Sequence, residues 1–316
     1  MYKLLTILLF WVSLTANSQM IINASNYYRP FPNNYSYLLS LYPTTGFAYS
    51  FRKLSSTYSG YCVRVRRSSD NTESSIGFSN NYIDTVSMKS FVGANTGYIT
   101  IWYDQSGNSY DVSQSTATAQ PTIMTSGSIN YTNKCVCAIF NGSSNTLVST
   151  SSFSSFGTSV SFSSVVFDKN AGSNYQYQWA VGVTNPTGTK AFISSAAGAY
   201  LDWNTYSTIF WGNGYNSTAP RAITAANQFV NNTQNLWFGA LNSTANSILL
   251  NGNSLGLIST STANVSSTGG SVSIGASLTG GNYSSEYIQE VVVWQSNQSA
   301  NSTAIIANID NFYKVY

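Results

Sequence analysis

The chain contains no histidine, and only 7% of its 316 residues are charged. The first absence excludes Ser-His-Asp and Cys-His catalysis, and zinc sites held by histidine. The 13 basic and 10 acidic residues nearly balance, so no basic surface of the kind that binds nucleic acid is expected. A calcium site needs several clustered carboxylates, which so few acids do not favour. We therefore expect no cofactor and no metal.

Cysteine is also scarce, with Cys62, Cys135 and Cys137 as the only three. An odd number leaves at least one thiol without an intramolecular partner. Two alternatives stay open from the sequence. Cys62 forms a disulfide with one of the other two, or all three are free buried thiols.

One long apolar run is present, Leu4–Leu14, and it is too short to span a bilayer comfortably. Lys3 precedes it and the small residues Ala16–Ser18 follow it, which is the pattern of a secretory signal peptide. We predict that residues 1–18 are a signal peptide cleaved before Gln19; an uncleaved N-terminal anchor is the alternative. The mature protein is then secreted, extracellular or at a cell surface, with no membrane contact after cleavage.

Short runs rich in Val, Ile, Thr, Tyr and Phe alternate with clusters of Gly, Asn and Ser along most of the chain, which predicts an all-β protein. The clearest predicted strands are Tyr98–Tyr103, Val160–Phe167, Leu236–Leu241, Ser271–Ile274 and Tyr287–Trp294. Ser247–Gly256 predicts a hairpin, because Asn251-Gly252 supplies the positive φ angles of a tight turn. Many short strands in a chain of this length indicate a sandwich or a barrel.

Helix signals are few. Tyr37–Leu41 and Thr85–Phe91 predict single turns. Near the C-terminus, Ser299 or Asn301 can cap a helix. Apolar residues then recur at the spacing of one helix face: Ile305, Ile306, Ile309, Phe312 and Tyr313. We predict one short terminal helix packed against a sheet.

Charge is concentrated in one place. Five of the 13 basic residues lie in a 16-residue window: Arg52, Lys53, Arg64, Arg66 and Arg67. Asp70, Glu73 and Asp104 follow and are natural bidentate partners for arginine. We predict a structural ionic cluster of Arg64, Arg66, Asp70 and Asp104, with a polar sugar site as the alternative. Asp104–Asn108 predicts a turn.

These charged segments resemble a known family. Tyr49–Leu54, Val65–Phe78 and Trp102–Asn108 are similar to the hallmark segments of the N-terminal part of the α-L-arabinofuranosidase B catalytic domain. The segment from Leu236 to the end resembles laminin-G-like and concanavalin-A-like domains. Together the two resemblances imply an all-β, concanavalin-A-like (laminin-G-like) jelly-roll sandwich. We expect residues 19–130 to be the arabinofuranosidase-like segment, continuous with a sandwich over 131–316.

The resemblance implies retaining enzymes, which need a nucleophilic carboxylate and an acid/base about 5–5.5 Å apart. In the family the nucleophilic Glu follows two adjacent paired cysteines, and this chain has no such cysteine pair. Between Asn141 and Ser285 its only acids are Asp168 and Asp202.

Glu286 and Glu290 lie four residues apart on a predicted strand. They should share a face and sit about 13 Å apart, which is too far for a retaining pair. If the chain is a hydrolase, the predicted catalytic pair is therefore Asp202 with Glu286.

The aromatic run from Asp202 to Tyr215 is the predicted glycan-binding site, since aromatic faces stack on sugar rings while Asp and Asn bind hydroxyls. Its candidate residues are Asp202, Trp203, Tyr206, Trp211 and Tyr215. The alternative is that these aromatic side chains alternate into the core.

The expected function is a secreted, non-catalytic β-sandwich that binds carbohydrate or cell-surface glycans. One alternative is a self-associating subunit of an extracellular filament, surface layer or virion, suited to a surface rich in uncharged hydroxyl and amide groups. The second alternative is an α-L-arabinofuranosidase-like glycoside hydrolase.

Overall fold

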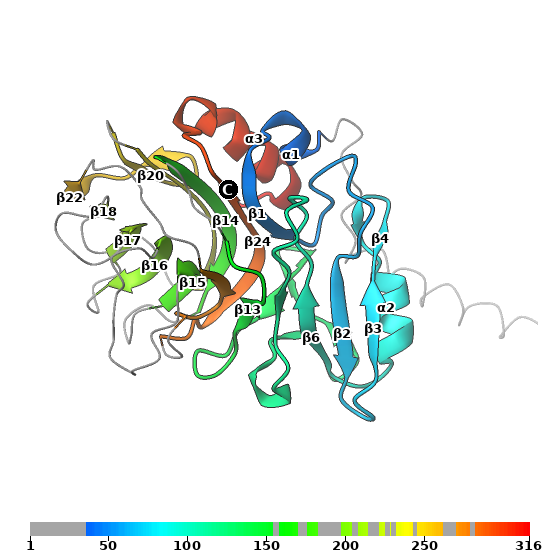
Figure 1. Ribbon diagram of the computed structural model, residues 1–316. Helices are drawn as coiled ribbons and strands as arrows, with labels where there is room; N and C mark the ends of the chain where they lie inside the picture. Colours follow the sequence, from blue (N-terminus) through cyan, green and yellow to red (C-terminus); the bar gives the residue numbers. More distant parts are fainter. Residues whose placement is uncertain are drawn as a thin grey trace, which may run out of the picture. The chain divides into compact units, whose positions relative to one another are not determined.

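The protein is built almost entirely from antiparallel strands (Figure 1). The computed structural model describes residues 36–153, 158–169, 176–182, 197–203, 208–213, 221–224, 228, 232–242, 245–261, 270–278 and 282–316. Residues 1–35, which include the predicted signal peptide, lie outside this part. Within it, hydrogen bonds join most strands into one continuous sheet that folds into two facing layers.

The first layer is centred on the long strand β24 (Glu286–Trp294). One edge of β24 pairs with β14 (Val160–Asp168), and the other pairs with β1 (Thr45–Ser50) and β12 (Ala138–Ile139). Beyond β14 the layer continues through β19 (Thr233–Leu241), β20 (Ser247–Leu250) and β21 (Asn253–Ser254).

The second layer follows the order β7, β13, β23, β15, β16, β17, β18, β22. Its strands are Val112–Ser113, Leu147–Ser149, Ser271–Ile274, Gln176–Gly182, Ala197–Trp203, Thr208–Asn213, Arg221–Thr224 and Leu257–Ser261. Trp179 of this layer packs between Phe47 and Phe162 of the first layer, with ring centroids 5.6 and 5.8 Å away. The buried interior therefore lies between the two layers.

A smaller group of N-terminal strands surrounds β6 (Gly97–Trp102) and contributes to both layers, since β6 pairs with β2, β7 and β8. The other strands of this group are β2 (Val63–Arg67), β3 (Glu73–Ile76), β8 (Thr122–Thr125) and β9 (Ser128–Ile129). Two short ribbons stand apart, β4 (Phe78–Ser79) with β5 (Tyr82–Ile83), and β10 (Tyr131–Thr132) with β11 (Cys135–Val136).

The helices are short and lie on the outer faces of the strands (Figure 1). Helix α2 (Thr85–Val92) packs beside β2 and β3; Asp84 caps it by accepting the Ser87 N–H at 3.0 Å. Helix α1 (Leu38–Leu41) packs against helix α3 (Ser302–Tyr313) beside β1 and β24. Two 3-10 turns, Ala117–Ala119 and Ser299–Asn301, complete the described elements.

The fold confirms the predicted all-β sandwich with a short C-terminal helix. Asn251 and Gly252 take φ angles of 49° and 79° in the β20–β21 turn, as the Asn-Gly sequence predicts. The five apolar residues predicted to form the inner face of the terminal helix are all buried. In the described residues, we find no helix with the length and apolar character needed to cross a membrane.

Candidate functional site

Two buried carboxyl groups stand directly opposite one another in the first layer. Asp168 is the last residue of β14 and Glu286 is the first residue of β24, and they are register partners. Their exposed fractions are only 2% and 1%. Side chains directly opposite in an antiparallel pair have Cβ atoms about 4.5–5.5 Å apart. The two carboxyl groups are therefore held close together by the sheet itself.

A β-bulge in β24 determines which way Glu286 points. Val165 pairs with Glu290 while Val166 pairs with Ile288, so Gln289 is an extra residue in the ladder. The bulge reverses the alternation of side chains, and Glu286 and Glu290 lie on opposite faces. The predicted shared face is wrong for this reason. Glu286 lies beside Gln178 of the second layer, whereas Glu290 contacts Tyr313 of α3.

Hydrogen bonding at the pair is incomplete. Asn235 of β19 donates its Nδ2 to Asp168 Oδ2 at 2.7 Å. Ser284 and Gln178 lie beside Glu286 and lower its pKa, yet neither completes a hydrogen bond of ordinary geometry with it. Around the pair, five buried polar atoms of described residues complete no hydrogen bond of ordinary geometry: Asp168 Oδ1, Glu286 Oε1 and Oε2, Gln178 Nε2 and Ser284 Oγ. Buried polar atoms are nearly always paired, so this group is exceptional and is suited to binding something polar.

Burial also changes the acidity of the pair. Loss of hydration raises the pKa of Asp168 to about 7, although the hydrogen bond from Asn235 and the proximity of Glu286 act in the opposite direction. Burial raises the pKa of Glu286 well above its usual range, and the neighbouring Asp168 charge raises it further. No described cation pairs with either carboxyl group. At neutral pH the pair therefore holds at least one proton, more firmly on Glu286.

The sequence pointed to Glu286 but paired it with Asp202. Asp202 and Trp203 end strand β16, and Trp211 lies on β17, which pairs with β16 as a hairpin. The side chains of these three residues, and Tyr206 and Tyr215 entirely, lie outside the described residues. The predicted glycan-binding site therefore stays a prediction. The sequence signal for Asp168 is weak: it directly follows the predicted strand Val160–Phe167, as Glu286 directly precedes Tyr287–Trp294, but local pattern does not show that these strands pair.

The structure corrects the predicted ionic cluster, because its members lie in separate environments. Arg64 pairs with Glu73 at 3.0 Å on the surface. Arg67, which the prediction omitted, holds Asp70 at 2.6 Å. Arg66 contacts no carboxylate of the described residues and instead donates to amide oxygens.

Asp104 serves the turn that its sequence predicts. Its Oδ1 accepts the N–H groups of Ser106 at 2.9 Å and of Ala48 at 2.8 Å, and Oδ2 accepts that of Tyr110 at 3.1 Å. These bonds satisfy the backbone of the loop and attach it to β1. Asp104 is thus a buried anchor for the loop and pairs with no arginine of the described residues.

A buried ion pair joins Arg52 to Glu290, a pairing that no sequence pattern predicted. Arg52 Nε lies 2.6 Å from Glu290 Oε2, and Arg52 Nη2 lies 2.8 Å from Oε1, with both side chains fully buried. Ser50 and Tyr313 donate further hydrogen bonds to the same carboxylate. This pair is fully satisfied and attaches α3 to the outer face of β24.

The cysteines follow the second of the two alternatives. Cys62, Cys135 and Cys137 are all free and buried. Burial raises the pKa of Cys137 to about 12, which makes it a poor nucleophile. Among the described residues, no group of three or more Cys, Asp or Glu could hold a metal ion. The expectation of no cofactor stays a prediction.

Comparison with known proteins agrees with the resemblance drawn from the sequence. The family described as "Alpha-L-arabinofuranosidase B, catalytic" matches residues 42–198. The fold is similar to an arabinofuranosidase complexed with arabinofuranosyl-α-1,2-xylobiose, at 18% identity and a TM-score of 0.56 over 84% of this chain. A GH54 α-L-arabinofuranosidase soaked with a cyclic sulfate inhibitor gives 17% identity and a TM-score of 0.58, also over 84% of this chain. This chain spans 62% of the length of each enzyme. No curated protein sequence matches it.

These findings overturn the expected function. A non-catalytic protein is the expectation from sequence because no Glu lies between Asn141 and Ser285. The chain instead resembles a catalytic domain over residues 42–198, and its fold is that of solved α-L-arabinofuranosidases. The second alternative, a glycoside hydrolase, is therefore better supported than a non-catalytic role.

Proposed function

We propose that the chain is an α-L-arabinofuranosidase-like glycoside hydrolase and that Asp168 and Glu286 are its catalytic carboxyl groups. The observation that carries this proposal is the pair itself, two buried acids on adjacent strands with no described counter-charge. Retaining glycosidases place their two carboxyl groups about 5–5.5 Å apart. The Cβ atoms of a directly opposed cross-strand pair lie about 4.5–5.5 Å apart, so the sheet brings these two side chains within reach of that arrangement.

The difference in environment assigns the two roles. Asp168 accepts a hydrogen bond from Asn235, which favours its ionised form, so it is the nucleophile. Glu286 has no such donor and faces the Asp168 charge, so it keeps its proton and is the general acid.

The reaction then follows in two steps. Asp168 attacks the anomeric carbon while Glu286 gives its proton to the leaving alcohol oxygen, and the glycosidic bond breaks. Glu286, now a carboxylate, takes a proton from water, and the resulting hydroxide displaces Asp168 from the sugar. Both side chains are almost fully buried, so the chain around them must open before a substrate can reach them.

Hydrolysis of 4-nitrophenyl α-L-arabinofuranoside tests the proposal. The wild-type protein should release 4-nitrophenol, and Asp168→Asn and Glu286→Gln should each lower kcat by about 10²–10⁴-fold. Glu73→Gln is the matched control, because it removes an acid from an exposed pair. Asp202→Asn tests the pair predicted from sequence. Loss of activity in that variant, with Asp168→Asn unaffected, would reject our assignment; no wild-type turnover on a panel of furanosides would reject the function.

We also propose that the protein acts outside the cell on glycans, since residues 1–18 have the pattern of a signal peptide. N-terminal sequencing of protein collected from the culture medium should begin at Gln19. A mature chain that begins at Met1 would contradict this.

A further inference from the structure

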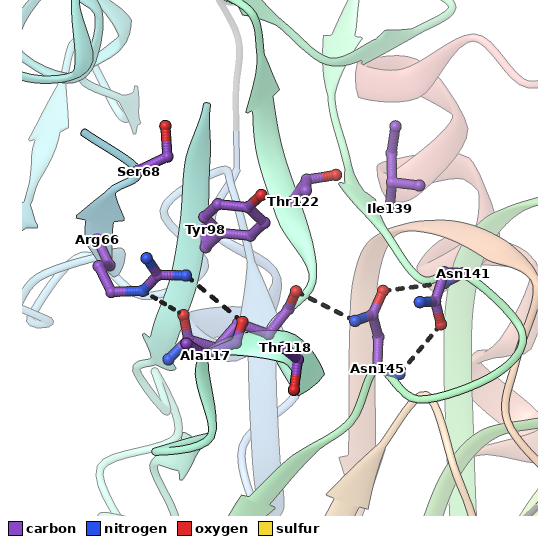
Figure 2. A pocket seen from close by; sticks show the side chains of 10 residues that line it. Arg66, Ser68, Tyr98, Ala117, Thr118, Thr122, Ile139, Asn141 and Asn145 are labelled. Atoms are coloured by element: carbon purple, nitrogen blue, oxygen red, sulfur yellow. Dashed lines mark hydrogen bonds between the residues drawn. The ribbon is translucent and has the colours of Figure 1, made fainter. Parts of the chain in front are cut away.

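A second polar site lies apart from the carboxyl pair, in a pocket of about 470 Å³ beside β2 and β6. This volume falls within the range of pockets that bind small ligands. Figure 2 shows Arg66 and Tyr98 on one side of the pocket, Asn141 and Asn145 on the other, and Thr122 between them. The lining is thus one cation, one aromatic ring and several neutral hydrogen-bonding groups.

Arg66 is the exceptional member of this lining. It is only 9% exposed, and no carboxylate of the described residues pairs with it. Its Nε donates to Gln120 Oε1 at 2.7 Å, its Nη1 to Asn71 Oδ1 at 2.7 Å, and its Nη2 to the Ala117 carbonyl at 3.4 Å. These bonds fix the side chain, and its guanidinium lies over the Tyr98 ring, 4.6 Å from the ring centroid, but no described carboxylate neutralises its charge. Since a guanidinium has five N–H donors and three are used, two remain for a ligand.

The rest of the surface is suited to a sugar chain. Tyr98, Thr122, Ile139, Tyr287 and Phe167 are successive register partners across five strands, and all are half-buried. At about 4.8 Å per strand, this row extends about 19 Å from Tyr98 to Phe167. The rings of Phe167 and Tyr287 are stacked 5.5 Å apart, and Lys169 Nζ lies 4.9 Å from the centroid of the Tyr287 ring.

We propose that this pocket binds a glycan that contains a uronic acid. Arg66, which is held over the Tyr98 ring, binds the sugar carboxylate, and the sugar chain continues along the row toward Tyr287. A single planar guanidinium matches a singly charged carboxylate. No second cation lines the pocket within the described residues, which disfavours a doubly charged phosphate. The row runs through Tyr287 and Phe167, which alternate with Glu286 and Asp168, so it lies on the opposite face from the carboxyl pair.

Isothermal titration calorimetry with a tetragalacturonate, and with the same tetramer after reduction of its carboxyl groups, tests the site. The acidic tetramer should bind at least 10-fold more tightly than the reduced one. Arg66→Gln should weaken binding of the acidic tetramer by about 10- to 100-fold, because it removes a charged hydrogen bond. It should also abolish the preference for the acidic over the reduced tetramer. Arg64→Gln is the matched control, because Arg64 lies two residues away on β2 but pairs with Glu73.

Two further variants keep the test decisive. Thr118→Trp fills the pocket from an exposed position, so it should abolish binding even if Arg66→Gln does not fold. Glu286→Gln should bind like the wild type, which separates this site from the proposed hydrolysis. Equal affinity for both tetramers, tighter binding of a sulfated tetramer, or no binding by the wild type would each overturn the proposal.

Discussion

Strand β24 carries two buried glutamates four residues apart that differ in the face they occupy and in their partners. Glu290 accepts two hydrogen bonds from Arg52 and others from Ser50 and Tyr313. Glu286 faces the other way, beside Asp168, and neither of its carboxyl oxygens completes a hydrogen bond of ordinary geometry within the described chain. One carboxylate is compensated and joins elements together. The other is uncompensated beside a second acid.

The two glutamates distinguish a structural acid from a candidate functional one. A buried ion pair whose hydrogen bonds are all satisfied stabilises the fold as a unit. Removing one partner leaves the other as an uncompensated buried charge, which destabilises the protein. A pair of buried acids with unpaired oxygens contributes nothing comparable to stability. We propose that this pair serves chemistry, because its raised pKa values supply a proton donor near neutral pH.

The largest expected effect is on stability. Glu290→Gln should lower the free energy of unfolding by about 3–5 kcal/mol, since it leaves Arg52 buried without a counter-charge. Glu286→Gln should leave stability unchanged or raise it, because it removes a buried acid. Urea denaturation measures the free energy of unfolding of both variants and of the wild type. A destabilised Glu286→Gln beside a tolerated Glu290→Gln would reverse our assignment of roles.

The next effect is on the pH dependence of stability. The pKa of Asp168 is raised to about 7 in the folded state from an ordinary value of 3.8, and that of Glu286 is raised too. Between about pH 4 and pH 7 the folded protein therefore binds more protons than the unfolded chain. The free energy of unfolding should fall as the pH rises through this range.

Denaturation midpoints across this range should decline in the wild type and decline less in Asp168→Asn. Asp70 and Asp84, whose pKa values are lowered, act only at more acidic pH and do not offset the trend. A slope that is identical in Asp168→Asn and wild type would show that the pair does not titrate as we infer.

A smaller effect should follow from Asn235→Ala. This change removes the donor that favours ionised Asp168, so the pKa of Asp168 should rise and the acid limb of the pH–rate profile should move to higher pH. The free energy of unfolding should fall by about 1 kcal/mol. Asn253→Ala, at an exposed amide in the β20–β21 turn, is the control and should shift neither quantity.

The smallest effect should come from the surface. Glu73→Gln breaks the half-exposed pair with Arg64 and should cost less than about 1 kcal/mol. A larger loss, measured by the same denaturation, would mean that exposure is a poor guide to the value of an ion pair in this protein.

Local features of the fold could be predicted from the sequence. The β20–β21 turn and helix α3 follow from Asn251-Gly252 and from apolar spacing, because both patterns act within a few residues. The order of strands does not follow from local pattern, so nothing in the sequence placed β14 beside β24. The bulge at Gln289 was equally invisible. These two features bring Asp168 to Glu286 and send Glu290 to the other face, and for this reason the sequence identified only half of the candidate pair.

The most direct test of the catalytic pair is covalent labelling with a furanoside cyclic sulfate, which traps a nucleophilic carboxylate. Peptide mapping by mass spectrometry then locates the adduct. We predict one label per chain, on the peptide that contains Asp168, and none in Asp168→Asn. A label on Asp202 or any other acid, or no label on wild-type protein, would contradict the account.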